Sequence, residues 1–108
     1  MTEAIAISQE EAITKLPGTL ELVNRKNTCI MTQRPPTSLA RDVDNEEFPR
    51  AVKNGSKLNF WPLHEIEIMN AAKAAGKSRS EIRELVKELE AARKRLFDSL
   101  MKKYKVVA

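Results

Sequence analysis

The chain has 108 residues, of which 42% are hydrophobic and 31% are charged, and it contains three glycines. This length suits one domain without a second core of comparable size, and the composition favours a folded, largely helical protein over a disordered or fibrous one. Nineteen Lys and Arg residues against fifteen Asp and Glu residues give a net charge of +4 and a pI near 9.4. This moderate excess of positive charge favours a polyanionic partner.

Cysteine content and the terminal sequence limit the class and the location of the protein. The single cysteine, Cys29, excludes an intramolecular disulfide and a cysteine-based zinc site within one chain, and favours a reducing compartment. No apolar run approaches the roughly 20 residues that span a bilayer, and residues 1–12 are acidic where a secretion signal would be basic. We therefore expect a cytoplasmic protein with no membrane contact.

The first third of the chain carries weak local patterns. Residues 1–12 predict an N-terminal tail, with a helical turn begun by Ser8 as the alternative. Residues 13–16 alternate apolar and polar side chains, which is typical of a short half-buried strand. One or two helical turns are predicted over residues 20–26, and residues 27–33 have no clear period, so their structure stays open.

A helix is predicted over residues 37–47. Pro35-Pro36 suits its start, because proline lacks the N–H that a first turn leaves unpaired and its φ is already helical. Phe48-Pro49 ends it, because the residue before a proline is pushed towards extended geometry. The inward stripe of this helix consists of Leu39, Ala40 and Val43.

A β-hairpin should follow. Residues 52–53 and 57–61 are strand-like, and Asn54-Gly55 between them supplies the two positive-φ residues of a tight type I′ turn. This hairpin would place Lys53 and Lys57 near the tip of a small basic wing.

The last third of the chain predicts two helices. Pro62 opens the first, which ends at Gly76, and Ser78 to Glu81 forms a capping box that starts a longer helix reaching Tyr104. The apolar side of the longer helix is wider than a coiled-coil seam, so we expect it to fold back on the head in part and to pair with a second copy. The division between these two roles stays open.

These elements predict a mainly α fold with a small β-hairpin. A winged helix-turn-helix head would occupy residues 13–76, preceded by the tail of residues 1–12. A basic helical extension for self-association would occupy residues 77–108.

Several motifs resemble those of the AlpA family of phage and prophage regulators. The resemblance covers residues 13–75 and depends on the run Phe48 to Lys53, on Asn54-Gly55, on Trp61 and on His64-Glu65-Ile66. In that family a short strand and helix precede a recognition helix, a phenylalanine-proline step, a hairpin wing and a packing helix.

The resemblance implies a winged helix-turn-helix of the MerR/AlpA-like type that binds double-stranded DNA. It further implies a transcriptional regulator or an excisionase, also called a recombination directionality factor. Several copies bound side by side would recruit an integrase or the transcription machinery.

The predicted recognition helix supplies the first candidate contacts with DNA. Arg41 is the residue we expect to contact a guanine, with Thr37 and Ser38 on phosphate or base edges. The alternative is that Arg41 pairs with Asp44 or Glu47 on a solvated face. The end of this helix is acidic and would repel phosphate unless its carboxylates face away; they belong to Asp42, Asp44, Glu46 and Glu47.

The predicted wing supplies the second set of candidate contacts with DNA. Lys53 and Lys57 suit phosphate contact, and Arg34 and Arg50 would extend the same basic stripe. The alternative is that these lysines only protect an exposed strand edge from unwanted pairing. The complete predicted DNA-binding set is Arg34, Thr37, Ser38, Arg41, Arg50, Lys53, Asn54, Ser56 and Lys57.

The long C-terminal helix has two candidate roles. Its first half is patterned for salt bridges, whereas its end from Arg93 to Lys105 is basic and would lie along DNA or attract it without sequence preference. The residues predicted to mediate self-association are Ile82, Leu85, Leu89, Leu96 and Leu100.

No residue pattern supports catalysis, a metal or a cofactor. His64 is the only histidine and has no second ligand at metal spacing, so we expect a solvated residue in a first helical turn. Cys29 suits a small buried apolar group, and Trp61 suits the core. The sequence also lacks a phosphate-binding glycine loop and a nucleophile elbow.

Two other functions remain as alternatives to a regulator. A small terminase subunit would also join a winged head to an oligomerising helix, and a closed ring of many copies would identify it. A helical protein-interaction module would use its basic residues only for solubility, and would show no salt-dependent affinity for DNA.

Overall fold

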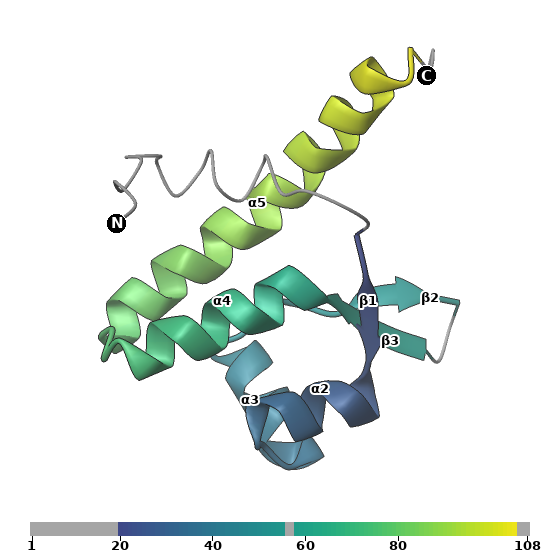
Figure 1. Cartoon of the computed structure of the whole chain (residues 1–108). Helices are drawn as coiled ribbons and strands as arrows, with labels where there is room; N and C mark the ends of the chain where they lie inside the picture. Colours follow the sequence, from purple (N-terminus) through teal and green to yellow (C-terminus); the bar gives the residue numbers. More distant parts are fainter. Residues whose placement is uncertain (1–19, 56–57, 106–108) are drawn as a thin grey trace, which may run out of the picture.

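The computed structural model describes residues 20–55 and 58–105. In these residues the chain is mainly helical, with one small three-stranded antiparallel sheet, which confirms the predicted fold class (Figure 1). The elements in chain order are β1 (Leu22–Asn24), α2 (Arg25–Thr32), α3 (Pro36–Asp44), β2 (Val52–Asn54), β3 (Leu58–Pro62), α4 (Leu63–Ala74) and α5 (Arg79–Lys103). The tail and the strand predicted within residues 1–16 lie outside the described residues.

The sheet has the strand order β1-β3-β2, so the central strand β3 joins the hairpin to the start of the head. Val23 pairs with Trp61 on one side of β3, and Lys53 pairs with Asn59 on the other. The predicted hairpin is therefore present, but its two-residue turn is wrong. Asn54 belongs to β2 and pairs with Leu58, and Gly55, which follows it, has φ +79°.

The helix predicted over residues 20–26 is wrong at the centre of this segment, where β1 (residues 22–24) pairs with β3; only Arg25 and Lys26 are helical, as the start of α2. Helix α2 starts only at Arg25, where the Asn24 side chain accepts a hydrogen bond of 2.8 Å from the Asn27 N–H. The segment 27–33, which has no apolar period, falls mostly within α2. Its buried residue is a polar one, Thr28, whose hydroxyl donates to the Asn24 carbonyl at 2.8 Å.

Helices α2 and α3 form a helix-turn-helix. Gln33 ends α2 in the left-handed conformation, with φ 57° and ψ 36°, and Pro35 then precedes the first turn of α3. The helix predicted over residues 37–47 is confirmed as α3, although it ends at Asp44. Glu46 has φ +60°, so the chain turns away from the helix axis after Asp44 and leads into Phe48-Pro49.

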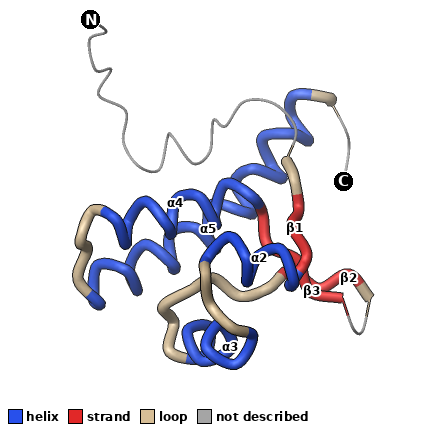
Figure 2. Tube along the Cα trace, turned by 60° about the horizontal axis from the view of Figure 1, so that its bottom comes forward, coloured by secondary structure: helices blue, strands red, loops and turns tan. Residues whose placement is uncertain are grey.

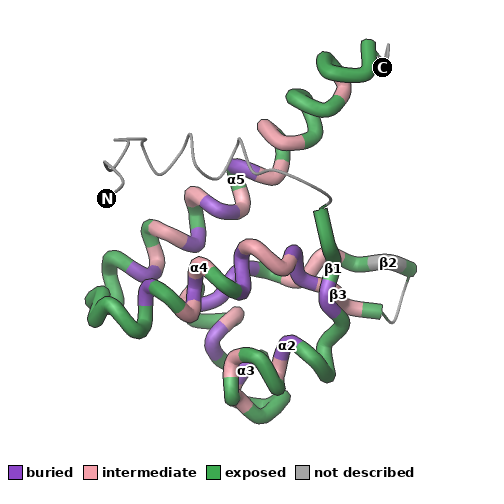
Figure 3. Tube along the Cα trace, in the orientation of Figure 1, coloured by how far each residue is buried: buried purple, intermediate pink, exposed green. Residues whose placement is uncertain are grey.

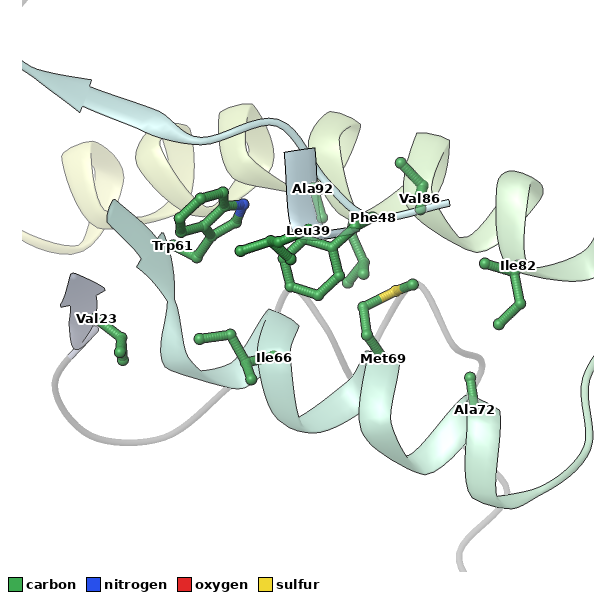
Figure 4. Close-up of a cluster of buried hydrophobic side chains, with 11 residues drawn as sticks. Val23, Leu39, Phe48, Trp61, Ile66, Met69, Ala72, Ile82, Val86 and Ala92 are labelled. Carbon is green, nitrogen blue, oxygen red and sulfur yellow. The ribbon is translucent and has the colours of Figure 1, made fainter. Parts of the chain in front are cut away.

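A single hydrophobic core joins the head and the C-terminal helix. Figure 4 shows Leu39 and Phe48 between the side chains that α4 and α5 contribute. The Phe48 ring meets the edge of Trp61 at a centroid distance of 5.9 Å, and the Trp61 Nε1–H donates to the Pro49 carbonyl at 2.7 Å. The contributions of α5 to this core are Ile82, Val86, Leu89 and Ala92.

These contacts correct the expected domain boundary. Gly76 does not separate a head from an independent extension, because half of α5 completes the core of the head. Beyond Ala92 the helix continues past the head, and its residues become increasingly exposed (Figure 3).

Candidate nucleic-acid interface

Helix α3 presents one side to solvent. Thr37, Ala40, Arg41 and Asp44 are exposed, whereas Leu39 is 2% exposed. Successive residues of an α-helix are rotated by about 100°, so these four exposed positions share one face. Figure 2 shows α3 at the edge of the molecule with the β2–β3 hairpin beside it.

An open hollow of about 350 Å³ lies between α3 and the hairpin. Helix α3 lines it with Ala40, Val43 and Asp44, and the hairpin lines it with Lys53 and Asn59. Two of the four exposed positions of α3, Ala40 and Asp44, therefore border the same space as the hairpin, whereas Thr37 and Arg41 do not line it.

The charged side chains that line the hollow are mainly basic. Three cations line it, Arg25 at the start of α2, Arg50 before the hairpin and Lys53 on β2, against the single carboxylate of Asp44. Arg25 was not among the predicted DNA-binding residues, because its contribution depends on β1 bringing the first turn of α2 beside the hairpin.

Arg41 is exposed on α3, one residue beyond Ala40. Among the described residues it has no hydrogen-bond or ion-pair partner, so the alternative in which it pairs with Asp44 or Glu47 is not observed. Its guanidinium is available for a ligand.

Arg34 does not extend the basic stripe of the wing as predicted. Its Nε and Nη2 donate to the two carboxylate oxygens of Asp42, each at 2.9 Å. This hydrogen bonding raises the pKa of Arg34 above its ordinary value. The pair fixes the turn of the helix-turn-helix to α3, and the guanidinium is thereby engaged within the protein.

The acidic end of α3 is partly neutralised. Asp42 is held by Arg34, and Glu47 forms ion pairs with Arg79 at 2.7 Å and with Arg83 at 3.3 Å. Of the four carboxylates expected to oppose DNA, only those of Asp44 and Glu46 remain exposed on the outside.

Of the remaining residues predicted to bind DNA, the two on α3 lie on different sides of that helix. Thr37 shares the exposed face with Ala40, whereas Ser38 is half-buried and, two residues from Ala40, is rotated by about 200° from it. Ser38 therefore does not border the hollow. The side chain of Asn54 and residues 56–57, hence the predicted Ser56 and Lys57 contacts, lie outside the described residues.

Helix α5 fixes the segment between α3 and the hairpin. The Arg50 N–H donates to Glu90 at 2.8 Å, and Arg93 donates to the Arg50 carbonyl at 2.8 Å. Arg93 also donates to both oxygens of Glu65, at 2.8 and 2.7 Å. Arg83 in turn donates to the Asn45 carbonyl at 3.1 Å. Helix α5, for which packing on the head and pairing with a second copy were both expected, thus holds the backbone of Arg50 beside the hollow.

Glu65 is a buried carboxylate, with a side chain that is 0% exposed. Burial raises its pKa above the ordinary value, while the hydrogen bonds and the positive charge of Arg93 act in the opposite direction. Sequence patterns did not reveal this pair, because Arg93 lies 28 residues further along the chain.

The self-association set requires a correction. Ile82 and Leu89 are 6% and 0% exposed in the protein's own core, and Leu85 packs against that core. These three side chains are not available to a second copy. Leu96 is half-buried and Leu100 is 45% exposed. The large apolar side chains left exposed at the end of α5 are Phe97, Leu100 and Tyr104.

The other side chains singled out in the sequence, those of Trp61, His64 and Cys29, are buried or half-buried. Trp61 lies in the core as predicted, whereas His64 is half-buried, and burial together with Arg93 lowers its pKa. Cys29 is half-buried against the core. Within residues 20–55 and 58–105, no cluster of three or more His, Cys, Asp or Glu side chains is arranged to hold a metal ion. No helix in the same ranges has the length and apolar character needed to cross a membrane.

The fold defines a winged helix-turn-helix in which a long C-terminal helix completes the core. No protein-family model matches the chain, and neither a curated protein nor a solved structure gives a significant match.

Proposed function

We propose that this protein is a cytoplasmic, sequence-specific DNA-binding regulator of a phage or mobile element, acting on transcription or as an excisionase. The observation that carries the proposal is the basic hollow shared by α3 and the hairpin, with Arg25, Arg50 and Lys53 around it. The resemblance of the phenylalanine-proline step and the wing to the AlpA family supplies the biological setting.

In this proposal α3 enters the major groove of double-stranded DNA. Arg41 has the donor geometry for the two acceptors of a guanine, and Thr37 lies on the same exposed face. Arg50 and Lys53 contact phosphates of the adjacent backbone, together with Arg25. Asp44 lies among these cations and accepts from an exposed base amino group, such as that of cytosine.

The proposal includes self-association through the end of α5. A small winged head buries little surface on DNA, so useful affinity requires several copies on neighbouring sites. Phe97, Leu100 and Tyr104 continue the apolar face of α5 beyond the head and remain exposed. A second copy would cover these side chains. Such an array would recruit an integrase or the transcription machinery.

Duplex binding is tested by measuring the affinity of the full chain for a random DNA duplex over a series of salt concentrations. Lys53→Ala is expected to reduce the log–log salt slope by about 0.9, because one phosphate contact is lost. Lys87→Ala is the matched control, since Lys87 lies on the exposed face of α5 opposite Val86 and Leu89 and has only Glu84 as a partner, at 3.4 Å. Affinity that does not depend on salt would reject the proposal in favour of a protein-interaction module.

Base recognition is tested by selecting bound sequences from a random library. Arg41→Ala is expected to lower discrimination at one guanine position by about 1–3 kcal/mol, which is roughly tenfold to a hundredfold, while the salt slope changes little. An unchanged selected sequence would remove α3 as the recognition helix. Genomic fragments bound by the protein would then separate the two biological roles, because attachment sites indicate excision and promoters indicate transcriptional control.

A further inference from the structure

A second basic hollow, of about 390 Å³, lies on the other flank of α3, beside the turn between α4 and α5. It is lined by Arg34, Asp42, Glu47, Lys73, Lys77 and Arg79, together with the apolar Ile82. None of the three cations from the α4–α5 region was expected to contact DNA, because the sequence pattern there is typical of a solvated helix end.

The charges of this hollow leave two lysines without strong partners. Both carboxylates are already engaged, Asp42 by Arg34 and Glu47 by Arg79 and Arg83. Lys73 is exposed and has no ion-pair partner among the described residues. The Lys77 Nζ lies 4.0 Å from Glu81 in an exposed pair, which contributes little. The excess positive charge is therefore concentrated on Lys73 and Lys77.

The backbone of the turn is closely defined. Helix α4 ends with Gly76 at φ +76°, with the Gly76 N–H bonded to the Lys73 carbonyl at 3.0 Å and the Lys77 N–H bonded to the Ala72 carbonyl at 3.1 Å. These are the two hydrogen bonds of a Schellman motif. The capping box of Ser78 then starts α5 at once. A turn held at both ends presents its cations with little ordering cost on binding.

The position of the turn relative to α3 suggests its ligand. Figures 1 and 2 both show the α4–α5 turn on one side of α3 and the hairpin on the other. A helix in the major groove has one phosphate backbone on each side, and the groove is about 12 Å wide. In the proposed function the hairpin contacts one of these two phosphate backbones, so the α4–α5 turn faces the other one.

We propose that Lys73, Lys77 and Arg79 form a second phosphate-binding surface, which contacts the DNA strand on the side of α3 away from the hairpin. The Arg79 side chain is 73% exposed and its Nε is ion-paired with Glu47 at 2.7 Å, which leaves its two terminal guanidinium nitrogens without a partner among the described residues. The inference rests on the proposed DNA-binding function and extends it, because the recognition helix is then held from both flanks.

The test compares two variants of the full chain with an equal change of net charge. Lys73→Ala with Lys77→Ala is expected to reduce the log–log salt slope for duplex binding by about 1.8, since two phosphate contacts are lost. The affinity should fall equally for all sequences, with the selected base preference unchanged, because phosphate contacts do not distinguish bases. Lys87→Glu is the control, because it changes the net charge by the same two units at one exposed position of α5 that faces away from the core, and it should leave the slope unchanged.

The outcomes separate this inference from the proposed function. Equal slopes for the Lys73/Lys77 variant and the Lys87→Glu control would overturn the second surface, while the effect of Lys53→Ala on the slope would leave the DNA-binding function standing. No salt-dependent binding by the wild-type chain would overturn both. Both target lysines are exposed, so their variants should keep the thermal midpoint of the wild type, and Lys73→Gln with Lys77→Gln repeats the test with side chains of similar length.

Discussion

The two halves of α5 differ in what they contact. The near half, from Arg79 to Arg93, packs four buried side chains into the core and makes polar contacts with the segment between α3 and the hairpin. The far half, from Lys94 to Lys103, continues past the head and exposes Phe97 and Leu100. The apolar period runs through both halves, so periodicity identifies a helix face without identifying what covers it.

This difference connects folding with the proposed DNA contact. Arg50 lines the basic hollow, and its backbone is bonded on both sides by α5, through Glu90 and Arg93. Removal of the near half would therefore both open the core and release Arg50. We expect a chain that ends at Gly76 to lose its fold, whereas a chain that lacks only the far half should keep it.

The largest expected effect on the free energy of unfolding comes from comparing a leucine-to-alanine substitution in the near half of α5 with one in the far half. Leu89→Ala should lower the free energy of unfolding by about 4 kcal/mol, because Leu89 is 0% exposed and its removal leaves a cavity. Leu100→Ala, at a side chain that is 45% exposed, should change it by less than about 0.5 kcal/mol in the monomer. Urea denaturation at low protein concentration measures both values. Similar losses for the two variants would mean that the far half is also part of the monomer core.

The next effect tests the polar contact of the near half. Arg93→Ala leaves the carboxylate of Glu65 buried without its partner. It should lower the free energy of unfolding by about 3 kcal/mol at neutral pH. This value is near the low end for broken buried pairs, because Arg93 is 25% exposed. The neighbouring Lys94→Ala serves as the control, since Lys94 is exposed. Adding Glu65→Gln to Arg93→Ala should recover part of the loss, because the unpaired buried charge is removed.

The pH dependence of this variant has a defined sign. Burial raises the pKa of Glu65 in the folded protein, and removal of Arg93 raises it further, because Arg93 is what lowers it. The folded state then holds the proton more tightly than the unfolded state, so the loss in Arg93→Ala is complete above the raised folded-state pKa and shrinks as the pH falls towards the ordinary value of 4.5. A loss that stays constant between neutral and acidic pH would show that Glu65 is not the group responsible.

A smaller effect tests the far half. Phe97→Ala with Leu100→Ala should weaken self-association by about tenfold to a hundredfold, since truncation of central interface side chains costs about 1–3 kcal/mol. Lys102 and Lys103 would repel their copies across such an interface, so added salt should strengthen self-association while it weakens DNA binding. Light scattering over a range of salt concentrations measures the mass. A wild-type chain that stays monomeric at all concentrations would contradict the proposed pairing.

The elements that the sequence predicted correctly have local causes. Pro35-Pro36 marks the start of α3, and the capping box at Ser78 marks the start of α5, because each acts on the backbone within one helical turn. The hairpin and its left-handed Gly55 follow in the same way. Helix α4 needs only its own apolar stripe.

The elements that the sequence missed depend on distant partners. The segment 22–24 forms a strand because it pairs with β3, nearly 40 residues later in the chain. The local strand propensity of these three residues does not indicate that pairing. For the same reason the candidate site was only half predictable. Lys53 and Arg41 were found from local patterns, whereas the contribution of Arg25 and the support of Arg50 by Glu90, 40 residues away, required the tertiary structure.

The smallest predicted effect compares a serine-to-alanine substitution at the cap that precedes the near half of α5 with the same substitution inside the far half. Ser78→Ala removes the side chain that accepts from the Glu81 N–H at 3.2 Å, and should lower the free energy of unfolding by about 1 kcal/mol. Ser99→Ala, at an exposed position inside the far half, should instead raise it by a few tenths of a kcal/mol at most, because alanine has the higher helix propensity. Thermal and urea denaturation of the two variants should therefore give shifts of opposite sign. Shifts of the same sign would mean that the capping box contributes nothing beyond propensity, and that the near half is held by its buried side chains alone.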